Sequence, residues 1–177
     1  MNLLKCSLLI ISLSSFNAHA YFIDYLKVQY AGEIGFLSIG MGKRFGDVYS
    51  LEIFNGFVPE SIGGNEIESI AIKNIFDIVD FSIFNKNMIF YFGLNLYHVT
   101  GLDYQSSRHS SYPETYYRLG SIRGLLSFGL DFNLNATHGF YLESGLNDII
   151  LTNYLNNPDD VDLSKYVSHG IGYKNIF

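Results

Sequence analysis

The stretch Asn87–Thr100 reads NMIFYFGLNLYHVT and alternates between apolar side chains and polar or small ones. Every second residue from Met88 to Leu96 is apolar, and the residues between them from Tyr91 onward are Tyr, Gly, Asn and Tyr. A period of two is that of a β-strand, whose successive side chains point to opposite faces. The stretch therefore predicts a strand with one wholly apolar face.

The same alternation recurs on both sides of this strand. Arg118–Leu134 repeats it over a run that suits a tilted barrel strand. Six shorter stretches also repeat it, in residues 22–30, 37–44, 49–57, 69–78, 140–147 and 167–174. The eight stretches predict eight strands, with ten strands as the alternative.

The connections between these stretches are long and short in turn. The long ones are 101–115 and 153–163, whereas Ser82–Lys86 and Asn135–His138 are short and the first link, at 31–33, is tight. Outer-membrane barrels have short turns at one end and longer loops at the other. We therefore expect an all-β fold, an antiparallel up-and-down transmembrane β-barrel.

The polar face argues against a soluble β-sandwich, whose solvent face would be rich in Lys and Glu. Here that face is mostly Gly, Ser, Asn and Tyr, and charged residues are only 16% of the chain. The last strand ends on Phe177, with Tyr173 and Ile171 on the same side, and resembles the C-terminal signature strand of outer-membrane barrels. The resemblance implies a small Gram-negative outer-membrane barrel.

The first twenty residues have the features of a secretory signal. Lys5 supplies a positive charge, Leu8–Leu13 an apolar core and Ala18–Ala20 a small-x-small cleavage site. We expect cleavage after Ala20, which leaves residues 21–177 as the outer-membrane barrel domain. Cleavage also removes Cys6, the only cysteine, and with it any disulfide, thiol nucleophile or thiolate metal site.

Charged side chains fall on the inward phase of the predicted strands, where an eight-stranded barrel has only enough room for side chains. Five bases and four acids lie on this phase, so the charges can pair inside a filled lumen that is not a pore. The predicted lumen charges are Lys27, Arg44, Glu52, Lys73, Asp77, Arg123, Asp131, Glu143 and Lys174.

The residues suggest little catalytic chemistry. A serine hydrolase needs a serine, a histidine base and an acid, and the candidates are His109, Ser110 and Glu114 in an outer loop, with His98 at a strand end. Serine-rich loops of this kind are usually solvated linkers, so no catalytic residue is assigned.

The layout resembles the lipid A deacylase barrels, including an Asn/Pro/Asp-rich last outer loop at residues 156–159. That family has a His-x-Ser pair on the lipid-facing side of its penultimate strand, whereas the comparable stretch here, Ile150–Tyr154, has neither residue. The missing pair argues against that activity. Otherwise the chain resembles the uncharacterised small barrels of Gram-negative envelopes.

The charge balance limits the partners. A net charge of -6 without a basic run excludes a general nucleic-acid binder, and no cofactor or metal site is predicted, since Asp159, Asp160 and Asp162 form an ordinary acidic loop. We expect a non-catalytic outer-membrane barrel that contacts lipid and lipopolysaccharide, and an extracellular ligand through loops 101–115 and 153–163. The alternatives are a lipid A-modifying hydrolase or acyltransferase and a soluble periplasmic ligand-binding barrel.

Overall fold

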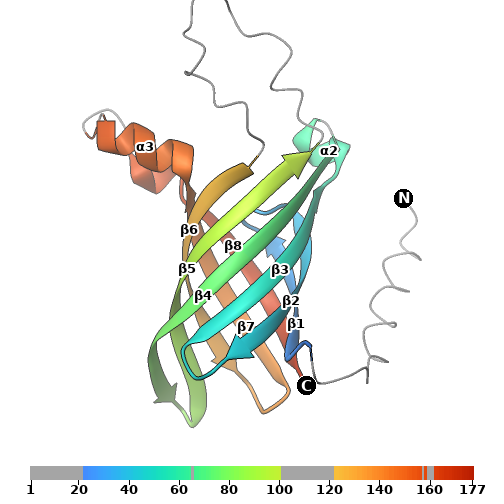
Figure 1. The fold of residues 1–177 in the computed structure, drawn as a ribbon, viewed down its shortest axis with the longest axis vertical. Helices are drawn as coiled ribbons and strands as arrows, with labels where there is room; N and C mark the ends of the chain where they lie inside the picture. The colour runs from blue at the N-terminus through green and yellow to red at the C-terminus, as the bar shows by residue number, and fades with distance from the viewer. Residues whose placement is uncertain (1–21, 65, 101–121, 157, 159–161) are drawn as a thin grey trace, which may run out of the picture.

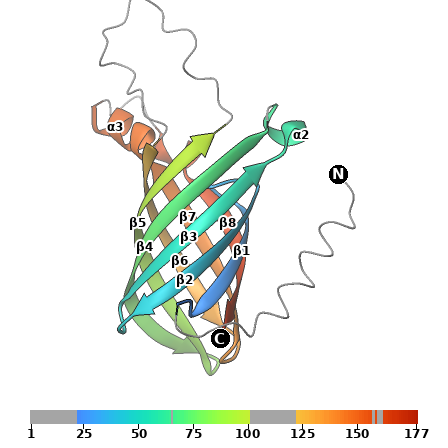
Figure 2. The same cartoon turned by 45° about the vertical axis from the view of Figure 1, so that its right-hand side comes forward.

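The computed structural model describes residues 22–64, 66–100, 122–156, 158 and 162–177. Eight strands pair in chain order, each antiparallel to its neighbours, and β8 closes on β1 (Figures 1 and 2). The all-β, eight-stranded prediction is confirmed and the ten-stranded alternative is wrong. The strands are β1 (Tyr25–Ala31), β2 (Leu37–Phe45), β3 (Tyr49–Val58), β4 (Ile67–Ile83), β5 (Lys86–Thr100), β6 (Ile122–Asn133), β7 (His138–Asn147) and β8 (Ser168–Ile176).

The two ends of the barrel differ, and we call them the turn end and the helix end. At the turn end β1 begins, β8 ends, and tight turns join β2 to β3, β4 to β5 and β6 to β7 (Figure 1). At the helix end, the described residues form the short helices α2 (Glu60–Gly63), α3 (Asp148–Asn156) and the 3-10 helix η1 (Leu163–Lys165). The strand bounds show the predicted alternation of short and long connections, and the predicted loop 101–115 lies outside the described residues.

The structure corrects three predicted boundaries. Residues 153–156 of the predicted loop 153–163 belong to α3, and so does Ile150–Tyr154, which was compared with a penultimate strand. The penultimate strand β7 ends at Asn147, as the predicted stretch 140–147 does, because the Asn147 side chain caps the helix there. The turn between β4 and β5 consists of Phe84 and Asn85 alone, both with positive φ (51° and 59°). Residues 118–121 of the predicted sixth strand lie outside the described part of the chain.

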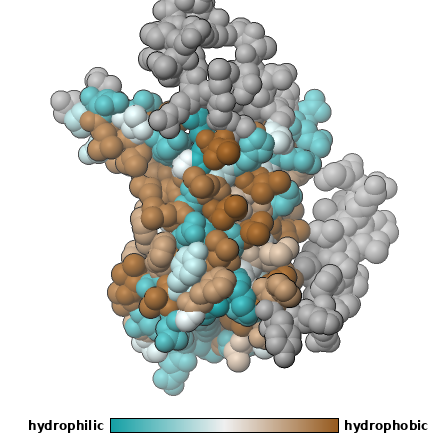
Figure 3. Space-filling model, in the orientation of Figure 1, coloured by the Kyte–Doolittle hydropathy of each residue, from teal (hydrophilic) through white to brown (hydrophobic). Residues whose placement is uncertain are grey.

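The two faces of the strands follow the predicted alternation. Leu94 and Leu142, from the predicted apolar phase, are 48% exposed on the outside, and Figure 3 shows apolar side chains over the side of the barrel. Lys27 and Glu52, from the polar phase, are 2% and 1% exposed. The interior also holds large apolar side chains that the sequence analysis did not place there: Phe54, Ile75, Ile89 and Leu125.

Inward aromatic rings lie over glycines on the adjacent strand. Tyr141 pairs with Gly172, where an added Cβ would lie 2.2 Å from the tyrosine ring. Tyr91 covers Gly129 in the same way, where an added Cβ would lie 2.3 Å from both Cζ and the hydroxyl oxygen of the tyrosine. Glycine is required at these positions because the ring occupies the space of a side chain. These glycines make room for large inward neighbours.

A cluster at the turn end, which we call the terminal clasp, joins the residue just before β1 to β2 and to the last residue of the chain. The Asp24 carboxylate accepts hydrogen bonds from Lys43 Nζ and the Arg44 amide, both at 2.7 Å, and the Phe177 amide donates to the Asp24 carbonyl oxygen (2.9 Å). Burial acts to raise the pKa of Asp24, but the hydrogen bonds and charges of Lys43 and Arg44 outweigh it and lower the pKa below its ordinary value.

Candidate functional site

Four ionised side chains meet inside the barrel, and we call them the four-charge cluster: Lys27, Glu52, Lys73 and Glu143. Lys27 Nζ lies 2.6 Å from Glu52 Oε1, and Lys73 Nζ lies 2.5 Å from Glu143 Oε2. Lys73 Nζ also lies 4.0 Å from Glu52 Oε2, which connects the two pairs. No side chain of the four is more than 6% exposed. Two positive and two negative charges cancel, as buried charges require.

Tyrosine side chains complete the cluster. The Tyr25 hydroxyl donates to Glu52 (2.7 Å), and the Tyr91 hydroxyl donates to Glu143 (3.1 Å). Lys27 Nζ lies 4.4 Å from the centroid of the Tyr141 ring, within the range of a cation–π interaction. The hydroxyls occupy carboxylate lone pairs that the lysines leave, and the rings fill the cross-section at this level.

The other predicted lumen charges do not bond to the cluster, although Lys174 lies beside Lys27 on the adjacent strand. Lys174 and Asp131 form a further buried ion pair between β8 and β6. Arg44 Nη2 lies 2.6 Å from Asp77 Oδ2, but Arg44 is 38% exposed, and Arg123, two residues into β6 from the helix end, is half-buried. Arg44 and Arg123 are on the predicted inward phase, but they lie close to the ends of their strands and are only partly enclosed.

The β1–β2 loop, residues 32–36, closes the lumen a second time. Ile34 is 2% exposed and packs in an apolar layer near the helix end. The Ser69 hydroxyl donates to the Ile34 carbonyl oxygen, which holds the loop inside the barrel wall. The other members of the layer are Phe54, Ala71, Tyr97 and Leu125.

The sequence predicts only a tight link at 31–33, whereas the structure has a five-residue loop between β1 and β2. Two glycines allow its path: Gly32 has a φ of 95°, and an added Cβ at Gly35 would lie 2.9 Å from the Phe57 amide nitrogen. Glycine tolerates positive φ and close backbone approach at little cost. The spacing of these two glycines around a single isoleucine was the only signal in the sequence.

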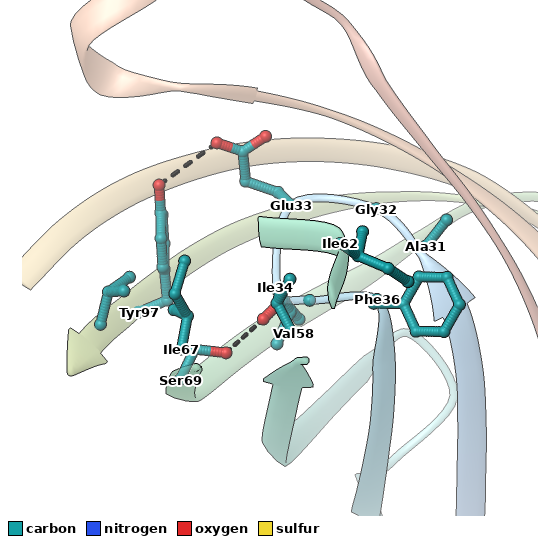
Figure 4. A pocket seen from close by; sticks show the side chains of 12 residues that line it. Ala31, Gly32, Glu33, Ile34, Phe36, Val58, Ile62, Ile67, Ser69 and Tyr97 are labelled. Carbon is teal, nitrogen blue, oxygen red and sulfur yellow. Dashed lines mark hydrogen bonds between the residues drawn. The ribbon is translucent and has the colours of Figure 1, made fainter. Parts of the chain in front are cut away.

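A cavity of about 390 Å³ opens beside this loop at the helix end (Figure 4). Glu33 is its charged residue, and its Oε1 accepts hydrogen bonds from the Tyr97 hydroxyl (3.2 Å) and Asn147 Nδ2 (2.7 Å). The cavity can take a small apolar group, since the remaining lining is largely apolar. That lining includes Ile34, Phe36, Val58, Ile62, Ile67 and Val99.

The catalytic candidates are not brought together by the described structure. His109, Ser110 and Glu114 lie outside the described residues, and His98 lies near the end of β5 between Ile70 and Ile122 of the neighbouring strands. A different pair forms instead: Ser144 Oγ lies 2.8 Å from His169 Nδ1 on the outward face, three residues before β7 ends. The sequence could not show this pair, because it depends on the register of β7 and β8.

A second outward pair has the same form at the opposite end of β7. The Tyr173 hydroxyl lies 2.6 Å from His138 Nδ1, and the two rings stack with their centroids 5.9 Å apart. Each pair satisfies one ring nitrogen with a hydroxyl from the adjacent strand. Among the described residues, no carboxylate hydrogen-bonds either imidazole as the acid of a catalytic triad would.

No helix in the described ranges is long and apolar enough to cross a membrane. In the same part of the chain, His, Cys, Asp and Glu form no group of three or more that could hold a metal ion. Asp162, from the predicted acidic loop, instead caps η1, where its carboxylate accepts from the Ser164 amide at 3.1 Å.

No model of a known protein family matches this chain, and no curated protein matches it. Among solved structures, the chain is similar to the Yersinia pestis outer membrane protein Ail, determined in a phospholipid bilayer nanodisc. The two sequences are 12% identical, the match covers 88% of this chain and 99% of Ail, and the TM-score is 0.45. Acinetobacter baumannii CarO is also similar, with 12% identity, a match that covers 90% of this chain and 100% of CarO, and a TM-score of 0.30. At these values the likenesses carry no argument about function, and the fold rests on the strand pairing of this chain.

Proposed function

We propose that this protein is a non-catalytic outer-membrane β-barrel, exported by a signal peptide that is cleaved after Ala20, with a lumen too full to pass solutes. The observation that carries the proposal is that apolar side chains face outward and charged side chains face inward, the reverse of a water-soluble protein. Phe90 and Leu94 are 39% and 48% exposed outside, whereas Lys73 and Glu52 are 0% and 1% exposed inside. Water penalises such an exterior by roughly 25 cal/mol per Å² of apolar surface, and hydrocarbon does not.

The topology sets the orientation within this proposal. Tight turns face the periplasm in outer-membrane barrels, so the turn end would lie there and the helix end outside. Outer-membrane lipid and lipopolysaccharide would surround the wall. The outer connection 101–115 and the part of 153–163 that follows α3 would then offer the surface for an extracellular partner. The role would be structural or one of surface contact.

The test is fractionation followed by electrophoresis. The protein should stay in outer membranes washed with urea and should migrate differently before and after boiling, because a closed barrel resists unfolding in detergent. It should also give no steady conductance in planar lipid bilayers. Release by salt or urea would favour the soluble periplasmic barrel, and a steady conductance would contradict the filled lumen.

A second candidate function, hydrolysis of a lipid ester or amide, rests on the outward Ser144–His169 pair. A hydroxyl 2.8 Å from an imidazole nitrogen is the geometry of an activated nucleophile. Mass spectrometry of lipid A from cells that express the wild type, a Ser144→Ala variant or no protein decides between the candidates. An acyl chain lost only with the wild type would replace the non-catalytic proposal, and identical lipid A in all three strains would support it.

A further inference from the structure

Helix α3 projects sideways from the barrel wall at the helix end (Figures 1 and 2). Its base is fixed by Asn147, whose Oδ1 accepts from the Ile150 amide (3.0 Å) and whose Nδ2 donates to Glu33 (2.7 Å). The first residue, Asp148, lies against β6, since a Cβ added to Gly124 would be 3.5 Å from its Cβ. The barrel therefore sets the direction of the helix.

The helix has an apolar side and a polar side. At 100° per residue, Ile150, Leu151, Tyr154 and Leu155 share one arc of α3. The opposite arc carries Asp148, Thr152, Asn153 and Asn156, with Ile149 as its one apolar member. No residue of α3 is buried, and Leu155 is 71% exposed. Ile150, Leu151 and Tyr154 are half-buried, so the barrel covers the apolar arc only in part and leaves its distal end, at Leu155, exposed.

The apolar side continues onto the outside of the barrel. Figure 3 shows apolar side chains on the side of the α3 projection that faces down along the wall, and hydrophilic ones on its upper side. At its base, α3 follows Leu146, which lies on the outward face of β7 beside Leu126 of β6. The wall and the helix thus form two adjoining sides of one apolar corner.

We propose that α3 is an interfacial helix that lies on the outer leaflet, with its apolar arc on the acyl chains of the lipid. This inference rests on the proposed function, because lipid fills the corner only if lipid surrounds the wall. Nine residues at 1.5 Å each give a reach of about 13 Å from the barrel, enough to cover the first ring of lipids. Asp148, the only charged residue of α3, lies at its base and leaves the distal part uncharged.

The chain has no tryptophan, so a single introduced tryptophan reports its own surroundings. Leu155→Trp probes the apolar arc of α3, Asn153→Trp the opposite arc and Leu142→Trp the barrel wall. Each variant, checked for folding by its unboiled gel mobility, is reconstituted in phosphatidylcholine vesicles with bromine near either the carbonyl end or the methyl end of the acyl chains. Bromine quenches tryptophan fluorescence only at close contact.

The proposal expects Leu155→Trp to lose most of its fluorescence with bromine near the carbonyl end, whereas Asn153→Trp keeps most of its own. Leu142→Trp should be quenched in either case. If Leu142→Trp is quenched and Leu155→Trp is not, α3 lies away from lipid and the inference fails while the membrane barrel stands. Equal quenching of Leu155→Trp and Asn153→Trp also overturns it. If no variant is quenched, the proposed function itself fails.

Discussion

Replacing Lys73 by methionine should lower the free energy of unfolding of the barrel through the loss of a charge, since the side-chain volume hardly changes. Methionine fills nearly the same space but carries no charge, and Lys73 is the residue that joins both acids of the four-charge cluster. Lys73→Met leaves Glu143 with only the Tyr91 hydroxyl at 3.1 Å. One unpaired negative charge then stays in a site where both carboxylates are at most 6% exposed.

The magnitude follows from this geometry. Removing one partner of a buried ion pair costs about 3–5 kcal/mol, because the other charge is left without compensation. Glu143→Gln should cost less, about 1–3 kcal/mol, since Lys73 keeps Glu52 at 4.0 Å. The double variant Lys73→Met/Glu143→Gln restores a neutral lumen, with the Lys27–Glu52 pair intact at 2.6 Å. It should therefore cost less than Lys73→Met alone.

The measurement is urea unfolding of each variant in lipid vesicles, followed by the gel mobility of unboiled samples. Lys165→Met is the matched control, because the Lys165–Asp162 pair is 3.5 Å long with side chains 73% and 53% exposed. Such a surface pair contributes little to stability, because water and salt screen it. A loss below about 1 kcal/mol for Lys73→Met, or a double variant that merely sums the single losses, would refute the paired-lumen reasoning.

Three further changes test other parts of the fold by the same unfolding assay. Gly172→Ala should lower the free energy of unfolding by about 1–3 kcal/mol through overpacking, because its Cβ would lie 2.2 Å from the Tyr141 ring. Gly124→Ala is the control and should leave the free energy of unfolding unchanged, because the nearest atom to its Cβ would be 3.5 Å away. Asp24→Asn should remove about 0.5–1 kcal/mol of the terminal clasp at neutral pH. Since the folded pKa of this carboxyl is lowered from 3.8, its contribution is present above that pH and lost as the pH falls through the lower value, so the difference from wild type should vanish there. Phe84→Asn should stabilise the β4–β5 turn by up to about 1 kcal/mol, because asparagine tolerates the φ of 51° better than phenylalanine does; an unchanged midpoint would contradict this.

The faces of the strands could be predicted from the sequence because they depend on a local property. A period of two assigns Leu94 outward and Asn95 inward without any knowledge of the neighbouring strands. The end of β7 at Asn147 agrees with the predicted stretch 140–147, but the helix that follows it was not predicted. The alternation of β7 fades at Asn147, and the following apolar residues at 150, 151, 154 and 155 have helical spacing that a search for strands passes over.

The partners inside the lumen could not be predicted, because they depend on how the barrel closes. Lys73 and Glu143 are 70 residues apart and belong to β4 and β7, which are not neighbours in the sheet. Which inward side chains meet across the axis depends on strand number, tilt and stagger together. The Ser144–His169 pair has the same origin, since a shift of one residue between β7 and β8 would separate the two side chains.

The lumen is closed by two layers of different chemistry, and together they bear on where a function can lie. Ions or water entering at the helix end would first have to displace Ile34 from its apolar layer. They would then meet the four-charge cluster, whose pairs a passing ion would have to break. Neither layer can open without loss of packing or of charge pairing, and both belong to the barrel itself. A role at the outer surface and in the surrounding lipid therefore accounts for the structure better than transport through its axis.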